Sequence, residues 1–264
     1  MENNIEQRKA IEAEFHDKLR DKELEKRPAE FDHLTSNRKY YMAARKSQAL
    51  MKELVTRYSK GKVGLDYCCG EGENAIIMAK GGAVRAYGMD ISPYSIGVCK
   101  KIAEKEGLAD KTDFKVMDAE NLQFPDNFFD FIVCAGVLHH LDVKKAYPQL
   151  ARVIKPDGIV ICSEPLAYNP IFQLYRRSTP HLRTKWEMEH ILTKNDVMLS
   201  LDYFRDIEIR FFNLATLASV ALRNTRIFLP VLSVLEKIDS VLLKIPGLRW
   251  LAWQSIYILK NPKK

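Results

Sequence analysis

The sequence lacks several features that would place it in particular classes of protein. It contains no apolar run of about 18 residues, so we expect no transmembrane helix. Its N-terminus is too densely charged for a secretory signal peptide. It has no internal repeat and no low-complexity segment. These absences favour a globular protein of the cytoplasm.

Cysteine is scarce and is not spaced for disulfides or metal ions. The five cysteines are odd in number, lie in or beside apolar segments and show no paired metal-ligand spacing. They are Cys68, Cys69, Cys99, Cys134 and Cys162. Such a set predicts reduced thiols in a cytosolic compartment and no metal centre.

Length and charge set broad limits on the fold and on the partners. The 264 residues favour one large α/β domain with appendages over two equal domains. The formal net charge of +7 is a modest excess of base. It fits an anionic membrane surface, an acidic substrate or nucleic acid, and it fits equally well a basic protein without such a partner.

Residues 63–72, Val-Gly-Leu-Asp-Tyr-Cys-Cys-Gly-Glu-Gly, are an apolar run that ends in an acid and a glycine-bearing turn. This pattern predicts the first strand of an α/β domain and a ligand-binding loop. The small residues Cys68, Gly70 and Gly72 let the backbone turn close to a ligand, and the helix expected from Glu73 offers unpaired N–H groups. Asp66 ends the strand, where open parallel sheets bind ligands.

Strands and helices then alternate at regular intervals, which predicts a doubly wound, mostly parallel sheet. We expect helices over 73–80, 93–106 and 143–154, and strands over 83–89, 113–116, 129–135 and 158–163. A helix over 193–201 with Thr193 as N-cap and strands over 204–212 and 253–259 complete the domain.

The flanking segments predict helical appendages. Residues 2–27 read as an amphipathic helix with Ile11, Phe15 and Leu19 on one stripe, stopped at Pro28, and packing on the domain's edge is favoured over a lid. A second helix is expected over 37–58, with its start over the ligand crevice. We divide one continuous domain into a helical cap (1–60), a cofactor-binding core (61–164) and a substrate-side region with the last strands and a helical insertion (165–264).

The glycine loop alone leaves alternatives open. Residues 70–75, Gly-Glu-Gly-Glu-Asn-Ala, fit the dinucleotide pattern G-x-G-x-x-A, and Asp90 lies where a ribose-binding acid is expected. A tight strand-to-helix turn explains the same glycines without any ligand.

Five motifs in order narrow the choice. They are the loop of residues 66–72, then 88–92 (Gly-Met-Asp-Ile-Ser), 117–120 (Met-Asp-Ala-Glu), 129–141 (Phe-Asp-Phe-Ile-Val-Cys-Ala-Gly-Val-Leu-His-His-Leu) and 150–158 (Leu-Ala-Arg-Val-Ile-Lys-Pro-Asp-Gly). Together they resemble the class I S-adenosylmethionine-dependent methyltransferases, above all the small-molecule branch with the ubiquinone and menaquinone methyltransferases. The resemblance covers about residues 62–163 and implies a seven-stranded, Rossmann-like sheet with a reversed terminal strand.

The resemblance also implies S-adenosyl-L-methionine as cofactor and assigns residues to it. Asp66 faces the amino group of the methionine moiety, Asp90 accepts from both ribose hydroxyls, and Asp118 accepts from the adenine amino group. The complete cofactor set is Asp66, Cys68, Gly70, Gly72, Asp90, Ile91, Asp118, Ala119, Ala135 and Gly136. Cys68 departs from the family, which commonly has glycine there.

Candidates for catalysis and acceptor binding follow less directly. His139 is placed over the transferred methyl, where it orients or deprotonates an acceptor; the alternative is that His139 and His140 only close the strand and pack. Adjacent histidines rarely share one metal ion. Glu164 is the next candidate base, or else it caps a loop or pairs with Arg183. Further acceptor-pocket candidates are Tyr40, Tyr168, Tyr175, Arg183, Glu187 and His190.

An apolar stretch with interspersed bases, residues 214–251, bears on the acceptor and on localisation. It suits a peripheral membrane contact or a pocket for a lipophilic acceptor. The favoured alternative is a set of helices packed against the sheet between its last two strands.

The sequence thus predicts methyl transfer from S-adenosylmethionine to a small organic acceptor, such as a lipophilic biosynthetic intermediate. No nucleic-acid partner is expected, because residues 135–138 and 163–166 lack the Pro-Pro-aromatic ending of base-amino methyltransferases. A nucleic-acid methyltransferase, a nicotinamide oxidoreductase and a non-enzymatic scaffold are the alternatives. The sequence determines neither the methylated atom nor the oligomeric state.

Overall fold

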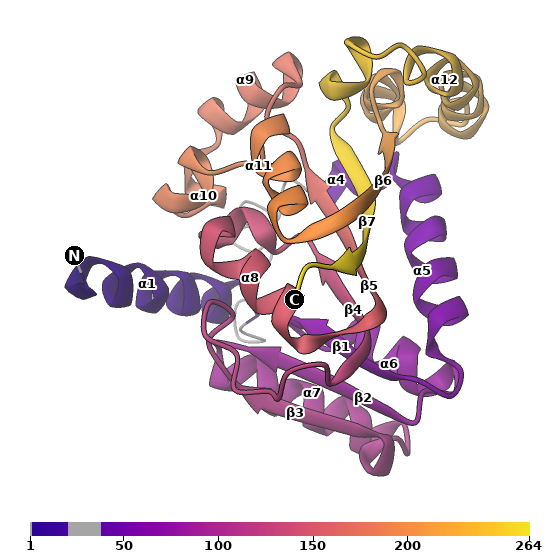
Figure 1. Ribbon diagram of the computed structural model, residues 1–264. Coiled ribbons are helices and arrows are strands. Elements are labelled where there is room, and N and C mark those ends of the chain that lie inside the picture. The colour runs from indigo at the N-terminus through magenta and orange to yellow at the C-terminus, as the bar shows by residue number, and fades with distance from the viewer. Residues whose placement is uncertain (1, 21–37) are drawn as a thin grey trace.

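The computed structural model describes residues 2–20 and 38–264, and its centre is one seven-stranded sheet (Figure 1). The strand order is β3-β2-β1-β4-β5-β7-β6, and β7 runs antiparallel to both of its neighbours. The strands are β1 (Val63–Tyr67), β2 (Arg85–Asp90), β3 (Thr112–Val116), β4 (Phe129–Ala135), β5 (Ile154–Pro165), β6 (Phe204–Phe212) and β7 (Gln254–Pro262). The predicted fold class, a mostly parallel sheet with a reversed terminal strand, is confirmed.

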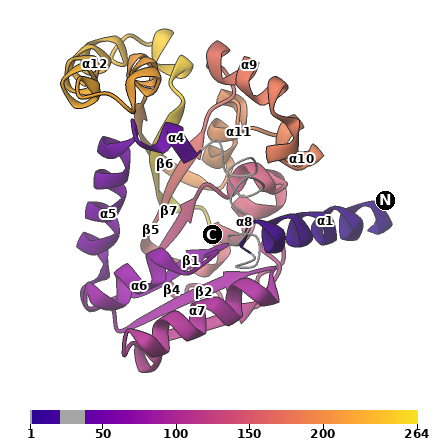
Figure 2. The same ribbon diagram turned by 180° about the vertical axis from the view of Figure 1, so that it is seen from behind.

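Helices cover both faces of the sheet (Figure 2). In β4, the alternating side chains Phe131 and Val133 pack with one set of helices, whereas Ile132 and Cys134 pack with the other. The first set is α5 (Arg45–Ser59), α6 (Glu73–Lys80) and α7 (Pro93–Lys105), and the second is α8 (Val143–Val153) and α11 (Lys194–Leu199). A strand covered on both faces needs a nearly continuous apolar sequence, which β4 has.

Local sequence fixes where these helices begin. Ser92 accepts a hydrogen bond from the Ser95 N–H in front of Pro93, and Asp142 caps α8 in the same way. Thr193 forms a capping box with Asp196, so the predicted N-cap of α11 is confirmed. The predicted helix over 193–201 ends at Leu199, however, and a 3-10 turn, η4 (Ser200–Asp202), follows it.

The N-terminal segment corrects two predictions. The helix α1 (Glu2–Arg20) does not pack on the domain's edge: Arg8, Lys9, Glu12 and His16 line a cavity at the carboxyl ends of the strands, although the N-terminus projects outward (Figure 1). Ile11 is 50% exposed, so it is not part of a buried stripe. The predicted stop at Pro28 lies outside the described residues, as does the side chain of Leu19.

The predicted second helix is interrupted. A single turn, α4 (Arg38–Tyr41), is followed by a break at 42–44 and then by α5. Ala43 and Ala44 at the break are almost fully buried, and Asn213 donates a hydrogen bond from Nδ2 to the Ala43 carbonyl at 2.8 Å. The break brings Tyr41 to the rim of the crevice, as expected for the start of this segment.

The C-terminal region builds one wall of the crevice and a separate helical layer. Its helices are α9 (Pro170–Ser178), α10 (Lys185–Glu189) and α12 (Phe228–Leu242), joined by 3-10 turns that include η5 (Ala215–Leu222) and η6 (Leu248–Leu251). The buried side of α12 packs on η5 and on the α4–α5 break through Phe228, Leu232 and Val220. The favoured expectation that this stretch packs against the sheet is confirmed only near its end, where Trp250 packs on Phe211 of β6, whereas α12 itself packs on η5. No helix in the described part of the chain is both long enough and apolar enough to cross a membrane.

Candidate active site

Two cavities adjoin at the carboxyl end of β4. The smaller has a volume of about 390 Å³ and lies over the ends of β1, β2 and β4. The larger, of about 830 Å³, lies between β4, β5, α5 and the C-terminal region. Both are lined by Ala135, Gly136, His16 and His140, so the two spaces communicate there. This is the point where strand order reverses between β1 and β4, the usual ligand position in such sheets.

Asp66 is buried at the floor of the smaller cavity. Its two carboxylate oxygens accept hydrogen bonds from Asn74 Nδ2 at 3.2 Å and from the Ala75 N–H at 3.1 Å. Only 1% of Asp66 is exposed. Burial raises the pKa of this carboxyl to about 7, even though both hydrogen bonds act to lower it. Asp66 is therefore an acid that ionises near neutral pH inside the site.

Asp90 organises the glycine loop. Its Oδ2 accepts from the Gly70 N–H at 2.9 Å and its Oδ1 from the Ser92 N–H at 3.0 Å. Each carboxylate oxygen has two lone pairs, so both retain capacity for a ligand hydroxyl. Ile91 follows on the cavity wall. The predicted positions of Asp90, Gly70 and Ile91 around one space are thus seen in the structure.

Backbone geometry explains the small residues of the loop. Gly70 and Gly72 have φ of 55° and 80°, and a Cβ on Gly72 would lie 3.0 Å from Cys99 Sγ. Cys68 also has a positive φ, 54°, in the left-handed region that non-glycine residues seldom adopt. Cys68 lines the smaller cavity, so a side chain stands at a left-handed backbone position where the resemblance implies glycine.

Asp118 and Ala119 close the far end of the smaller cavity. Asp118 Oδ2 accepts from Lys9 Nζ of α1 at 2.7 Å, while Oδ1 accepts from the Glu120 N–H at 2.9 Å. Arg8 reaches Glu120 with Nη2–Oε1 at 2.5 Å. The sequence did not single out Lys9, because an isolated lysine on a charged helix carries no signal of the acid it meets.

Glu164 and His139 form a buried pair beside Ala135 and Gly136. His139 Nδ1 lies 2.7 Å from Glu164 Oε2, and Glu164 Oε1 accepts from the N–H groups of Val137 and Leu138 at 2.9 Å. Glu164 is 1% exposed and His139 is 6% exposed. The alternative pairing of Glu164 with Arg183 is wrong, because Arg183 Nε lies 3.3 Å from Glu187 Oε1 instead.

His140 belongs to a different group of residues. Its Nδ1 lies 3.0 Å from Glu12 Oε2, and His16 Nε2 lies 3.7 Å from the same oxygen. Burial acts to lower the pKa of His140, but the hydrogen bond to Glu12 and the charges of Glu187 and Glu164 raise it above its ordinary value. The pair joins α1 to the 3-10 turn η2 (Leu138–His140) across the mouth of the smaller cavity.

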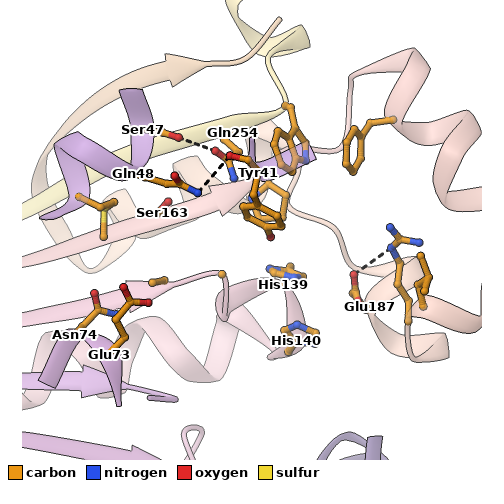
Figure 3. A pocket seen from close by; sticks show the side chains of 18 of the residues that line it. Tyr41, Ser47, Gln48, Glu73, Asn74, His139, His140, Ser163, Glu187 and Gln254 are labelled. Atoms are coloured by element: carbon orange, nitrogen blue, oxygen red, sulfur yellow. Dashed lines mark hydrogen bonds and ion pairs between the residues drawn. The ribbon is translucent and has the colours of Figure 1, made fainter. Parts of the chain in front are cut away.

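The larger cavity is lined by residues from many segments, which include α1, α5, α6, β4, β5, α9, α10 and β7 (Figure 3). Figure 3 shows Tyr41, His139 and His140 around the space, with Glu187 on one side and Glu73 and Asn74 on another. Of the predicted acceptor residues, Arg183 and Glu187 line this cavity. Tyr40, Tyr168, Tyr175 and His190 line neither cavity; Tyr40 and Tyr175 pack on each other, Tyr168 accepts from the Lys194 N–H, and His190 stacks on Trp186.

Several lining residues were missed from the sequence. In the larger cavity they include Arg45, Gln48, Arg176, Trp253 and Gln254, and in the smaller they are Arg8, Lys9, Glu12 and His16. They come from helix faces and from the reversed strand β7. Periodicity predicts which side of a helix is polar, but it does not predict what that side meets.

The strand topology defines the class of fold. The strand order with β7 reversed is the fold of the class I S-adenosylmethionine-dependent methyltransferases. One solved structure with this fold is Haemonchus contortus phosphoethanolamine N-methyltransferase 2, in complex with phosphomonomethylethanolamine and S-adenosylhomocysteine. The TM-score is 0.54 at 20% identity, covering 80% of this chain and 52% of that one.

Sequence comparison adds a family match and two relatives. Residues 65–162 match the family model described as a methyltransferase domain. It is 36% identical over 96 residues to sterol 24-C-methyltransferase ERG6B of Gibberella zeae, which is 36% of this chain and 25% of that protein. It is 30% identical over 146 residues to demethylmenaquinone methyltransferase of Geobacillus kaustophilus, 53% of this chain and 60% of that protein. The chain thus spans between a quarter and three fifths of these two relatives.

Proposed function

We propose that the protein transfers a methyl group from S-adenosyl-L-methionine to a small organic acceptor. One observation carries the proposal: the carboxylates of Asp66, Asp90 and Asp118 line one cavity, and this cavity opens at Ala135 and Gly136 into a second, larger one. Three acids spaced along a cavity suit a ligand with an amino group, a ribose and an adenine. The family match of residues 65–162 supports the same assignment.

The residues present fit this cofactor. The lone pairs left on Asp90 suit the two ribose hydroxyls, and the left-handed turns at Gly70 and Gly72 keep side chains away from the space above the loop. Asp118 already accepts from Lys9, so an adenine amino group would share this carboxylate with Lys9 or displace it. S-adenosylmethionine, when bound, supplies an electrophilic methyl group on a sulfonium.

The chain's own contribution is alignment and exclusion of water. We assign the core, residues 61–164, to cofactor binding, the segment 1–60 to closure of the cofactor cavity, and residues 165–264 to the acceptor side. The contacts of Lys9 with Asp118 and of Glu12 with His140 support the closing role of α1. Gly136 has a φ of 70° and no side chain, so it leaves room where the two cavities meet.

His139 is the residue we propose to act on an acceptor proton. A carboxylate only accepts hydrogen bonds, so the contact with Glu164 places the proton of His139 on Nδ1 and leaves Nε2 as the basic nitrogen. His139 lines the larger cavity, which suits removal of a proton from an acceptor. The oxygens of Glu164 are taken by His139 and by two backbone N–H groups, so we assign Glu164 as a positioning residue for His139.

Calorimetry with S-adenosylhomocysteine, the demethylated product, tests cofactor binding. Asp90→Asn keeps the shape of the side chain but replaces one acceptor oxygen by a donor, and we expect at least tenfold weaker binding, about 1.4 kcal/mol. Asp110→Asn, an exposed acid away from both cavities, is the control. Wild-type protein that binds neither the product nor S-adenosylmethionine would refute the proposed function.

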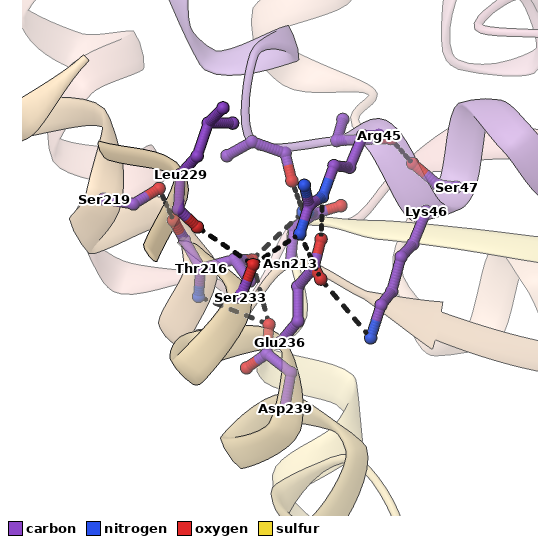
Figure 4. A network of polar contacts seen from close by, with 12 residues as sticks. Arg45, Lys46, Ser47, Asn213, Thr216, Ser219, Leu229, Ser233, Glu236 and Asp239 are labelled. Carbon is purple, nitrogen blue, oxygen red and sulfur yellow. Dashed lines mark hydrogen bonds and ion pairs between the residues drawn. The ribbon is translucent and has the colours of Figure 1, made fainter. Parts of the chain in front are cut away.

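We further propose that the acceptor is lipophilic and that α12 contacts a membrane surface. Five aliphatic side chains in and beside α12, Ile227, Val234, Ile238, Val241 and Ile245, are 41–63% exposed and share one face because they recur at intervals of three, four and seven residues. The two acids of the helix, Glu236 and Asp239, point toward Arg45 and Thr216 (Figure 4). Arg45 binds Glu236 at 2.6 and 2.8 Å, and Asp239 accepts from the Ala215 N–H at 2.6 Å. The exposed Lys237 and Lys244 flank the stripe, which favours anionic lipid.

Sedimentation with phosphatidylglycerol vesicles tests the membrane contact. We expect the wild-type chain to sediment and the double variant Val234→Glu/Val241→Glu to stay in the supernatant. The control is Val84→Glu/Val116→Glu, which alters two valines that are 64% and 52% exposed elsewhere on the surface. A wild-type chain that does not sediment, or that sediments no better than the Val234→Glu/Val241→Glu variant, would refute the contact.

A further inference from the structure

Arg176 is a buried charge that meets no carboxylate partner among the described residues. It lies on α9, lines the larger cavity and is only 4% exposed. Its one hydrogen bond among the described residues runs from Nη1 to the Leu166 carbonyl at a long 3.4 Å, and no ion pair is formed there. A buried guanidinium with five donors and one weak acceptor is costly, because buried charges are normally paired.

The charges around Arg176 do not balance it. Arg183, 8% exposed, lines the same cavity and forms an ion pair with Glu187. The three groups together carry two positive charges and one negative charge, so one positive charge is not compensated. Burial, together with the neighbouring charge of Arg183, lowers the pKa of Arg176 to about 10. At neutral pH the side chain is still cationic, so this end of the cavity carries a net positive charge.

Aromatic packing holds the guanidinium in place. Arg176 lies over the ring of Phe172 at 5.1 Å, and Phe172 stacks on Trp253 with centroids 4.8 Å apart. Trp253 and Phe172 also line the cavity, so apolar rings stand beside the cation. A rigid guanidinium fork next to apolar surface suits an organic anion with an apolar body.

We propose that Arg176 binds an anionic group of the methyl acceptor, a carboxylate or a phosphate, with the apolar part of the acceptor against Phe172 and Trp253. This assignment rests on the proposed function for the identity of the ligand as acceptor. The binding site itself does not depend on it, because the unpaired charge is a property of the chain alone. The anion completes a hydrogen-bonding set that the protein leaves open.

Calorimetry without cofactor tests the site with three probes of equal chain length: decanoate, decyl phosphate and decanol. We expect Arg176→Met to weaken binding of the preferred anion ten- to a hundredfold and to leave decanol binding unchanged. The control Arg177→Met removes the next residue, which is exposed and outside both cavities. Arg176→Lys keeps the charge but not the guanidinium fork, and its affinity for the anion should fall between those of wild type and Arg176→Met. The ratio of decanoate to decyl phosphate affinity identifies the group that is bound.

Thermal unfolding gives a second readout, which a structural role of Arg176 would not produce. Removal of an unpaired buried charge should leave the midpoint of Arg176→Met equal to or above that of wild type, and the anion should raise only the midpoints of chains that keep the arginine. Equal affinity of wild type and Arg176→Met for both anions would overturn the proposal, as would a clear loss of stability in Arg176→Met. Binding of S-adenosylhomocysteine is measured in parallel, and its failure would refute methyl transfer without affecting the anion site.

Discussion

Asp66 provides a sharp test of how burial controls the site. Its pKa is about 7 in the folded chain against 3.8 for an ordinary aspartate, so ionising it inside the fold costs roughly 4 kcal/mol. Because the pKa of Asp66 is raised in the folded chain, between about pH 4 and pH 7 the folded chain keeps a proton that the unfolded chain has already released. Stability contributed by this residue is therefore present at low pH and is lost as the pH rises through about 7.

The variant Asp66→Asn removes this titration. Wild type should lose about 2–3 kcal/mol of unfolding free energy between pH 5 and pH 8 through Asp66, and the variant should not. Asparagine has one acceptor oxygen for two donors, Asn74 Nδ2 and the Ala75 N–H, so about 1 kcal/mol is lost at every pH. By pH 5 wild type has already lost about 1–2 kcal/mol through Asp66, so the variant should be about as stable as wild type at pH 5 and clearly more stable at pH 8.

Urea unfolding at pH 5, 6, 7 and 8 measures both chains, with the exposed Asp110→Asn as control. If the proposed cofactor ammonium group lies at Asp66, wild-type affinity for S-adenosylhomocysteine also rises with pH through about 7, whereas Asp66→Asn binds weakly throughout. Parallel pH dependence of stability in wild type and Asp66→Asn would show that Asp66 does not ionise near neutrality, and the reasoning from burial would be refuted.

Three further substitutions test packing and backbone geometry. Gly64→Ala should lower the unfolding free energy by about 1–3 kcal/mol, because the new Cβ would lie 2.6 Å from Phe131 Cζ; thermal unfolding measures this, and an unchanged midpoint would contradict the tight fit. Cys68→Gly should change stability by no more than about 1 kcal/mol, whereas Cys68→Val should lower it further, since φ is 54° and β-branched residues avoid that region; urea titration of the pair checks the sign. Arg45→Ala should cost about 1–3 kcal/mol by leaving the buried Glu236 carboxylate with only Lys46 at 3.6 Å, and equal stability of Arg45→Ala and wild type would show that this ion pair is not needed.

The alternation of apolar strands and capped helices in the core was readable from the sequence. The predicted ranges 73–80, 129–135 and 204–212 coincide with α6, β4 and β6. Local signals set these ends: a left-handed glycine at 72, a buried apolar run, and an alternating strand pattern. Where caps are weaker, the bounds moved, as at the break between α4 and α5.

The sequence by itself determined the fold class and the acids that line the smaller cavity, because Asp66, Asp90 and Asp118 lie at or just beyond the carboxyl ends of strands, and parallel strands end at one edge of a sheet. Only the tertiary structure decided what those acids meet. Lys9 reaches Asp118 and Glu12 reaches His140 from a helix more than a hundred residues away, and no local pattern encodes such contacts. The same holds for Arg176. The sequence shows Arg183 and Glu187 a few residues further on, but only the folded position of α9 shows that Arg176 meets no carboxylate among the described residues.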